Sequence, residues 1–527
     1  MAYTCIRIEG GLLSADFLER ISEMEGQRPQ DFGLPPRHSL IDEISAVFSD
    51  VKLYWHAFLR RLNRSESKTT ITREQWVIPL LEALGYKLTY QRRAEQIEGR
   101  TYPISHRAGE DETAPPVHIV SCEQELGEKP TLGRQISPHA LLQDYLNRTE
   151  HLWGIVTNGY TLRILRDAFY FTRPSYIEFD LKQMIEGEHF DEFILFYRLV
   201  HRTRFPRSIS DAKDCLLERY HQESLAQGGR IREGLRNAVE KAIKTLGNGF
   251  LSHPKNNNLR QKIKQKQLSP TSFYQQLLRL IYRLLFLMVA EERHILTDNE
   301  IYYHYYSLSR LRDLSVSLPN ASLHYDDLYL GLRTLFQILR DQKFSPLLDV
   351  RPLDGKLFNP LDDLENVYLK NKDLLKAIYS LSYFVPPDEN VLRRINYSAL
   401  DVEELGSVYE SLLDYQPVIF EKEESLSFDL NPGTERKSTG SYYTPSCLVQ
   451  ELIKSALEPV IEERLKNLKT KEEKETALLS LKICDPACGS GHFLLAAARR
   501  LGEELAKIRT GEEAPSPESF KEAVRDV

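Results

Sequence analysis

"LKICDPACGSGHFLLAA", residues 481–497, sets an aspartate, a proline and several small residues between two apolar runs. The first run ends at Cys484, and the second has helical spacing and opens near His492. Small residues let a backbone approach a ligand closely, and a helix start offers unpaired N–H groups. The stretch therefore predicts a strand at 480–484, a ligand-binding turn with Asp485 at the strand tip, and a helix, as in the first crossover of a nucleotide-type α/β sheet.

Two better-known phosphate-binding loops do not fit this stretch. A P-loop needs a lysine and a serine or threonine after its last glycine, whereas Gly491 is followed by His492 and Phe493. A dinucleotide fingerprint needs G-x-G-x-x-G, and only Gly489-Ser490-Gly491 is present. Asp485 instead indicates a ligand that carries an ammonium group.

The segment "DPACGSGHFL", 485–494, resembles the first S-adenosyl-L-methionine (SAM) motif of amino-methylating DNA methyltransferases. "GSYYTP", 440–445, resembles the cofactor motif that precedes it in the gamma arrangement of that family. The resemblance implies that Asp485 holds the methionine amino group of SAM. It also implies the full set of cofactor-binding residues: Tyr442, Tyr443, Thr444, Pro445, Asp485, Pro486, Ala487, Gly489, Ser490, Gly491 and His492.

Within that set, the glycines and Ser490 would line the methionine and ribose, and the "YYTP" residues would close the other side. A zwitterionic methionine needs one acid and several N–H or hydroxyl donors, which a strand-to-helix junction supplies. Tyrosine faces favour the positive sulfonium. No catalytic residue and no metal ligand is predicted.

The resemblance extends upstream to three further segments: "EELGSVYESLLDY" (403–415), "LLRLIYRLLFLMVAEE" (277–292) and "DGKLFNP" (354–360). They resemble large restriction-modification methylases of type IIG and the related BREX- and DISARM-like phage-exclusion methylases. The resemblance implies a SAM-dependent DNA adenine (N6) methyltransferase of a restriction-modification or anti-phage defence system, with DNA as its partner.

The sequence departs from that family in one respect. Its catalytic Asn-Pro-Pro-aromatic tetrapeptide, which holds and stacks a flipped adenine, does not occur here. The adjacent prolines are Pro35-Pro36, Pro115-Pro116 and Pro386-Pro387, and none follows Asn or Asp. We therefore expect an N-terminal part of a longer enzyme, or one completed by a second polypeptide, that is inactive by itself. The alternative is a non-catalytic DNA- or protein-binding subunit of a defence complex.

A chain of 527 residues is too long for one core, and the sequence predicts a multidomain α/β protein. The expected parts are a helical N-terminal segment (1–70), a degenerate restriction-nuclease-like α/β domain (71–204), a helical connector with a basic strip (205–420), and the start of a class I, Rossmann-like methyltransferase domain (421–527). The last of these is expected to be incomplete.

Local signals in the second part predict several elements. "TREQWVIPLLEALGY" (72–86) predicts a helix with Thr72 as N-cap and Gly85 as terminator. "PVHIVS" (116–121) predicts a strand and "SPHALLQDYLN" (137–147) a helix. Asn158-Gly159 predicts a hairpin with a type I′ turn.

The metal ligands of an active nuclease are not recognisable in this part. Val117 stands where an aspartate is expected, Glu128-Lys129 are adjacent where the motif needs Glu-x-Lys, and Glu66-Ser67-Lys68 lies in a polar loop. A retained fold that docks partners or contacts DNA is favoured over an active nuclease.

Charge and composition limit the remaining possibilities. The net charge is −7, yet residues 201–270 hold 15 Lys+Arg and 6 Asp+Glu, which is +9 and leaves −16 elsewhere. This strip fits contact with a DNA backbone, and a solvated charged helix pair fits equally well. Six cysteines without metal spacing indicate a reducing cytoplasm. The apolar stretch 277–292 contains two arginines and predicts a buried helix, with no membrane span.

Overall fold

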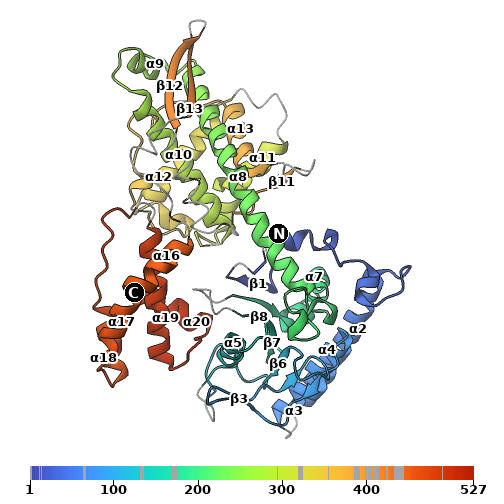
Figure 1. Cartoon of the computed structure of the whole chain (residues 1–527). Coiled ribbons are helices and arrows are strands. Elements are labelled where there is room, and N and C mark those ends of the chain that lie inside the picture. Colours follow the sequence, from blue (N-terminus) through green and yellow to red (C-terminus); the bar gives the residue numbers. More distant parts are fainter. Residues whose placement is uncertain are drawn as a thin grey trace. The chain divides into compact units, whose positions relative to one another are not determined.

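The structure is a computed structural model. It describes residues 3–10, 12–13, 15–62, 67–130, 136–167, 175–293, 295–317, 325–353, 355–384, 392–397, 400, 406, 408, 412, 415–422, 425–432, 444, 446–488 and 491–527; at 15–16, 226–233, 317, 393, 422, 432 and 446–447 it describes the backbone alone. The chain forms two compact units, 1–226 with 445–527, and 227–444 (Figure 1). The protein is an α/β protein with a mixed sheet and many helices.

A seven-stranded sheet is the centre of the first unit. Its order is β1 (Ile6–Glu9), β9 (Tyr176–Asp180), β8 (Thr161–Arg166), β7 (Trp153–Thr157), β6 (Pro116–Ile119), β5 (His106–Arg107) and β2 (Thr89–Tyr90). Neighbouring strands are antiparallel except β6 and β7, which are parallel and joined through helix α5 (Pro138–Arg148). A separate small hairpin pairs β3 (Glu95–Ile97) with β4 (Arg100–Tyr102).

Both faces of this sheet are covered by apolar side chains. Along β7 and β8, Ile155 and Ile164 belong to the core that contains α2 (Leu40–Leu62), α4 (Ile78–Ala83) and α7 (Phe190–Val200). Val156 and Leu165 belong to a second core, with Leu142 of α5. Successive side chains of a strand point to opposite faces, so this alternation places a helical layer on each side. Shorter helices complete the region: α1 (Ala15–Glu19), α3 (Lys68–Thr72) and α6 (Leu181–Glu186).

The Asn158-Gly159 hairpin is confirmed as β7 and β8, but the predicted type I′ turn is wrong, because Gly159 has a positive φ and Asn158 does not. The Asn158 side-chain oxygen accepts the N–H groups of Tyr160 and Thr161 at 3.0 and 2.8 Å, and Gly159 has φ +84°. The strand predicted at "PVHIVS" is confirmed as β6. The short helix is confirmed as α5, where the Ser137 hydroxyl accepts the Ala140 N–H.

The predicted N-cap at Thr72 is wrong, although Gly85 does end the helix with φ +83°. The helix starts at Lys68, and the Thr72 hydroxyl donates to the Lys68 carbonyl inside it. A π-helical turn, Arg73–Val77, then carries the helix to Pro79, which has no N–H to donate. A second π turn, Ile453–Leu457, precedes Pro459 at the same spacing.

The C-terminal part of the first unit is helical. It contains α16 (Ser446–Leu452), α17 (Glu458–Leu465), α18 (Lys471–Leu479), α19 (His492–Thr510) and α20 (Pro517–Asp526). The helix predicted to open near His492 is confirmed as α19. The strand predicted at 480–484 is wrong, because α18 runs to Leu479 and residues 481–485 form no strand ladder with any described residue.

Ion pairs and hydrogen bonds join the loop after α19 and helix α20 to the sheet and to the start of α5 in the same unit. The Ser137 N–H donates to Glu512 at 2.7 Å, Arg163 of β8 pairs with Glu518 at 2.8 Å, and Lys521 pairs with Glu9 of β1 at 2.6 Å. Glu512 is buried, so the first of these contacts is shielded from water.

The second unit is a helical bundle with a long hairpin. It holds most of α8 (Leu216–Ser252), and its other elements are α9 (Asn257–Lys264), α10 (Pro270–Glu292), α11 (Leu308–Ser317), α12 (Asp327–Arg340), α13 (Asn371–Ser382), β10 (Tyr383–Phe384) with β11 (Arg393–Arg394), and β12 (Tyr415–Lys422) with β13 (Ser425–Pro432). Side chains from these helices form one large apolar core.

Among the described residues, α10 alone is long and apolar enough to cross a membrane by length and composition. Within its most apolar window, 72% of the residues are buried inside the protein. Its polar residues are also satisfied internally: the Arg283 Nε donates to the Leu357 carbonyl at 2.8 Å, and Glu291 accepts the Leu308 N–H at 2.7 Å. The prediction of a buried bundle helix is confirmed.

Candidate functional site

The turn before α19 contains two short-range hydrogen bonds. The Asp485 Oδ1 accepts the N–H of Ala487 at 3.0 Å, which fixes the carboxylate over its own turn. The Gly491 N–H donates to the Cys488 carbonyl at 2.7 Å, and Gly491 has φ +81°. No described side chain caps the start of α19, so the helix presents backbone N–H groups at its first turn.

This turn is open to solvent. Cys484, Pro486, Ala487 and Cys488 are exposed, and Asp485 is half-buried. The side chain of Ile483 is 43% exposed, which is unusual for an apolar residue in a strand-like segment. His492, by contrast, is 7% exposed, and its ring contacts Phe493 at the start of α19.

Several predicted site residues lie outside the described residues: Tyr442, Tyr443, Pro445, Gly489 and Ser490. Thr444 is described and half-buried. What the structure does place is the helix that follows each motif. Val449 and Ile453, after the "YYTP" segment, pack against Ala497 of α19 in one apolar cluster. The two motifs therefore lead into helices that contact each other.

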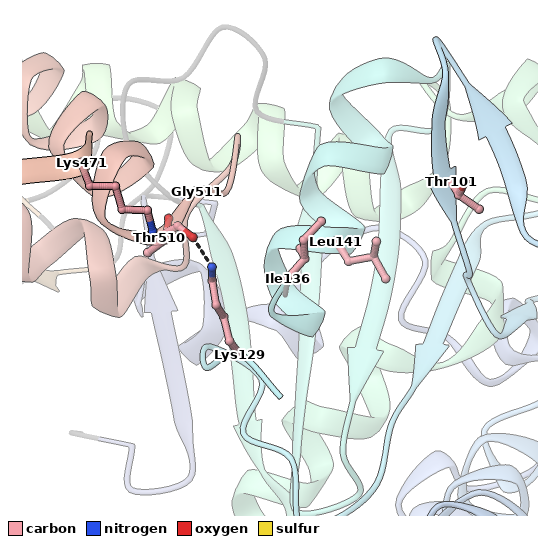
Figure 2. Close-up of a pocket in the computed structure, with 7 residues that line it drawn as sticks. All are labelled: Thr101, Lys129, Ile136, Leu141, Lys471, Thr510 and Gly511. Carbon is pink, nitrogen blue, oxygen red and sulfur yellow. Dashed lines mark hydrogen bonds between the residues drawn. The ribbon is translucent and has the colours of Figure 1, made fainter. Parts of the chain in front are cut away.

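A cavity of about 500 Å³ lies elsewhere in the first unit, and Figure 2 shows its lining. Lys129 and Lys471 line it, together with Thr510. Both lysines donate to carbonyls at the end of α19. Lys129 donates to Thr510 (Figure 2), and Lys471 donates to Arg509 at 3.3 Å. The two ammonium groups therefore satisfy backbone carbonyls at the C-terminus of α19. Among the described residues that line the cavity there is no acid, histidine or cysteine.

Several lysines of the basic strip pair with acids in the structure. In the second unit, Lys262 pairs with Asp363 at 2.7 Å and Lys264 with Glu421 at 2.8 Å. Lys244 is paired too, with Glu240 and Asp429. Phosphate binding by these lysines would have to break existing ion pairs, so the paired residues favour the charged-helix interpretation over DNA contact.

Sequence reasoning missed a buried polar network on β5. Arg107 is 1% exposed and pairs with Glu95, and its guanidinium donates to the Tyr145 hydroxyl at 2.5 Å. It also contacts the His151 ring at 3.2 Å, and burial together with Arg107 lowers the pKa of His151 to about 4. These four residues come from four separate segments, so no local sequence pattern could reveal them.

The comparisons with known proteins concern the C-terminal part. Residues 428–514 match the model of the N-6 DNA methylase family. A putative type II restriction enzyme and methyltransferase of Methanocaldococcus jannaschii is 25% identical over 195 residues, which cover 29% of this chain and 16% of that protein. The chain thus matches only a minor part of that relative's length. No solved structure matches. The two matches together show that the C-terminal part of the chain is similar to N-6 DNA methylases.

Proposed function

We propose that the turn 485–492 binds SAM in a DNA adenine methyltransferase of a restriction-modification or anti-phage system. The observation that carries the proposal is the Asp485 turn, which joins directly to a helix start with no side-chain cap. An acid beside the backbone N–H groups of a helix start matches the two charges of a methionine: the carboxylate oxygens receive its ammonium group, and the N–H groups receive its carboxylate.

The packing of α16 on α19 supports the second half of the site. Helix α16 follows the "YYTP" segment in the sequence, and its contact with α19 is consistent with a site shared by the two motifs. In this proposal Tyr442 and Tyr443 face the sulfonium, and Thr444 receives the methionine carboxylate. When bound, SAM supplies a methyl group that passes from sulfonium to the amino nitrogen of an extruded adenine.

We further propose that residues 481–485 become a strand when other strands pair with them. The support is physical: Ile483 is 43% exposed, and the segment's backbone has no ladder among the described residues. Apolar side chains and unpaired backbone groups together are the features of a sheet edge that awaits a partner. The partner strands would come from further sequence or from a second polypeptide, and in such an assembly the protein would act in the cytoplasm on DNA.

For the N-terminal region we propose a nuclease-like fold without nuclease chemistry. The order helix, β2, β5, β6, α5, β7, with β6 and β7 parallel, supports a restriction-nuclease-like core. Val117 is fully buried on β6, and the polar network of Arg107 occupies the neighbouring strand. A buried arginine in place of metal-binding carboxylates favours a docking module.

Isothermal titration of the full chain with SAM tests the cofactor site. Asp485→Ala should bind about 10–100-fold more weakly, because a hydrogen bond to a charged group contributes roughly 1.5–3 kcal/mol. Glu463→Ala is the matched control, since Glu463 is an exposed acid of α17 in the same part of the chain. Equal affinities for wild type and Asp485→Ala would overturn the site. Binding of DNA without any SAM heat would favour the non-catalytic subunit instead.

A further inference from the structure

Three metal-ligating side chains meet beside strand β1, far from the methyl-donor turn in the sequence. The Cys5 thiol, the His189 ring and the Glu192 carboxylate place their ligand atoms within 4.8 Å of one another. Cys5 precedes β1, His189 precedes α7, and Glu192 lies in the first turn of α7. We propose that these three residues bind a zinc ion.

The Glu192 carboxylate is already held in position for such a ligand. Its Oε1 accepts the N–H and the hydroxyl of Thr4 at 2.9 and 2.7 Å, and its Oε2 accepts the Cys5 N–H at 2.8 Å. An ionised carboxylate has about four lone-pair positions, so one position on Oε2 remains for a metal. Hydrogen bonds that orient a metal-binding carboxylate in this way are a common feature of metal sites.

The electrostatic surroundings favour a cation. Cys5 is 3% exposed, and the carboxylates of Glu192, Asp180 and Asp191 act electrostatically on its thiol. A cluster of negative carboxylates around a buried thiol lowers the energy of a divalent cation placed among them. Zinc binding would displace the thiol proton, as it does at other cysteine ligands.

The donor set fits zinc in chemistry and in size. Thiolate, imidazole and carboxylate are its three usual protein ligands, at roughly 2.0–2.3 Å from the ion, and water takes the fourth tetrahedral position. Neighbouring ligand atoms then lie roughly 3.5 Å apart, so a spread of 4.8 Å closes by small side-chain movements. The His189 ring is half-buried and makes no cap to α7, so it is available to turn.

The site would join an edge strand to a helix. β1 forms one edge of the seven-stranded sheet and pairs only with β9 among the described strands. Glu192 already ties the residues before β1 to α7 through the three hydrogen bonds above. A zinc ion would add a second link between the residues before β1 and helix α7. Zinc should therefore raise the free energy of unfolding of the first unit.

Metal analysis of the untagged full chain tests this proposal. We expect one zinc per chain after exposure to zinc and removal of loosely bound ions. Cys5→Ser and His189→Ala should each weaken zinc binding by more than the roughly 10–100-fold that loss of an outer-shell partner costs. Cys215→Ser is the matched control: Cys215 is also buried, and its thiol belongs to no such cluster among the described residues.

Cobalt provides a readout that does not depend on stability. Protein loaded with Co²⁺ should show a thiolate-to-metal absorption band that is absent in Cys5→Ser and retained in Cys215→Ser. Zinc contents that are equal in wild type, Cys5→Ser and His189→Ala would overturn the proposal. So would a cobalt band that depends on Cys215. His189→Ala keeps the test valid if Cys5→Ser does not fold, because His189 is only half-buried.

Discussion

Two segments of the first unit have similar sequence patterns but very different surroundings. The β6 strand, Pro116–Ile119, is buried at all four residues and pairs with β5 on one side and β7 on the other. Residues 481–485 carry a comparable apolar run, yet they form no ladder with any described strand. The difference shows that such a run becomes a strand only where other strands accept its backbone hydrogen bonds.

The helices that follow the two segments differ in the same way. The first turn of α5 is satisfied internally, because the Ser137 hydroxyl accepts the Ala140 N–H and Glu512 accepts the Ser137 N–H. The first turn of α19 follows Gly491 and has no side-chain cap. The start of α5 is therefore satisfied by contacts within the protein, whereas no described side chain caps the start of α19.

Acidification should destabilise the packed side of this comparison, the core around β6, and this effect should be the largest. His106, His151 and His201 have their pKa lowered to about 4, and that of His139 lies well below its ordinary value; burial is the main cause, and a neighbouring arginine adds to it. The unfolded chain binds these protons near pH 6.5. Stability of the N-terminal core is thus complete above pH 6.5 and falls as the pH drops from 6.5 toward 4.

The expected loss is roughly 3 kcal/mol for each histidine with a pKa near 4, since one pKa unit corresponds to about 1.4 kcal/mol. Tryptophan fluorescence measures it, because Trp55, Trp76 and Trp153 are all fully buried in this core. His201→Phe should lower the pH of the transition, since the His201 ring already packs against Phe32 and Tyr197. The exposed His56→Phe is the control. A native spectrum at pH 4 for the wild type would contradict the prediction.

Truncation of one isoleucine in β7, the parallel neighbour of β6, and of one in residues 481–485 should have the next largest effect. Ile155 pairs with Val117 across the β6–β7 ladder and is 1% exposed, so Ile155→Ala should lower the free energy of unfolding by about 2–5 kcal/mol. Ile483→Ala should change it by no more than about 0.5 kcal/mol, because Ile483 is 43% exposed.

Urea unfolding followed by tryptophan fluorescence compares the two variants directly. If Ile155→Ala does not fold, Ile155→Val gives a milder loss of about 0.5–1.5 kcal/mol for the same test. Equal destabilisation by Ile155→Ala and Ile483→Ala would mean that residues 481–485 are packed as tightly as β7, which would remove the contrast between the segments.

Local chemistry determined which features were predictable from sequence. The Asn158-Gly159 hairpin, the helix α5 and the helix start at His492 each depend on a few adjacent residues, and all three are confirmed. Thr72 is not a cap because the helix extends on both sides of it. A turn of α-helix precedes it and a π turn follows it, and neither has a sequence signature of its own.

Features that need distant partners were not predictable. The strand at 480–484 was expected from its apolar pattern alone, and the pattern could not say whether partners are present. Likewise, Cys5 lies more than 180 residues from His189 and Glu192, so only the pairing of β1 with β9 brings these ligands together. The roles of the SAM-site residues stay predictions, and five of those residues lie outside the described part of the chain.

The smallest expected effects concern two glycines, one in the turn between β7 and β8 and one at the start of α19. Gly159 and Gly491 both have positive φ, +84° and +81°, so alanine is strained at either position. An alanine Cβ at Gly159 would lie 2.9 Å from atoms of both Thr72 and Trp76, whereas at Gly491 it would meet nothing within 4 Å. Gly159→Ala should therefore cost roughly 2–3 kcal/mol and Gly491→Ala only about 1 kcal/mol.

Asparagine separates backbone strain from steric overlap at these positions, because it adopts left-handed conformations more readily than alanine. Gly491→Asn should recover most of the loss seen in Gly491→Ala, since only the backbone is strained there. Gly159→Asn should recover little, because its Cβ still meets the Trp76 ring, whose Nε1 donates to the Gly159 carbonyl at 2.7 Å. Thermal unfolding of the four variants measures both differences, and similar recovery at the two positions would mean that the Gly159 turn can move away from Trp76 at little cost.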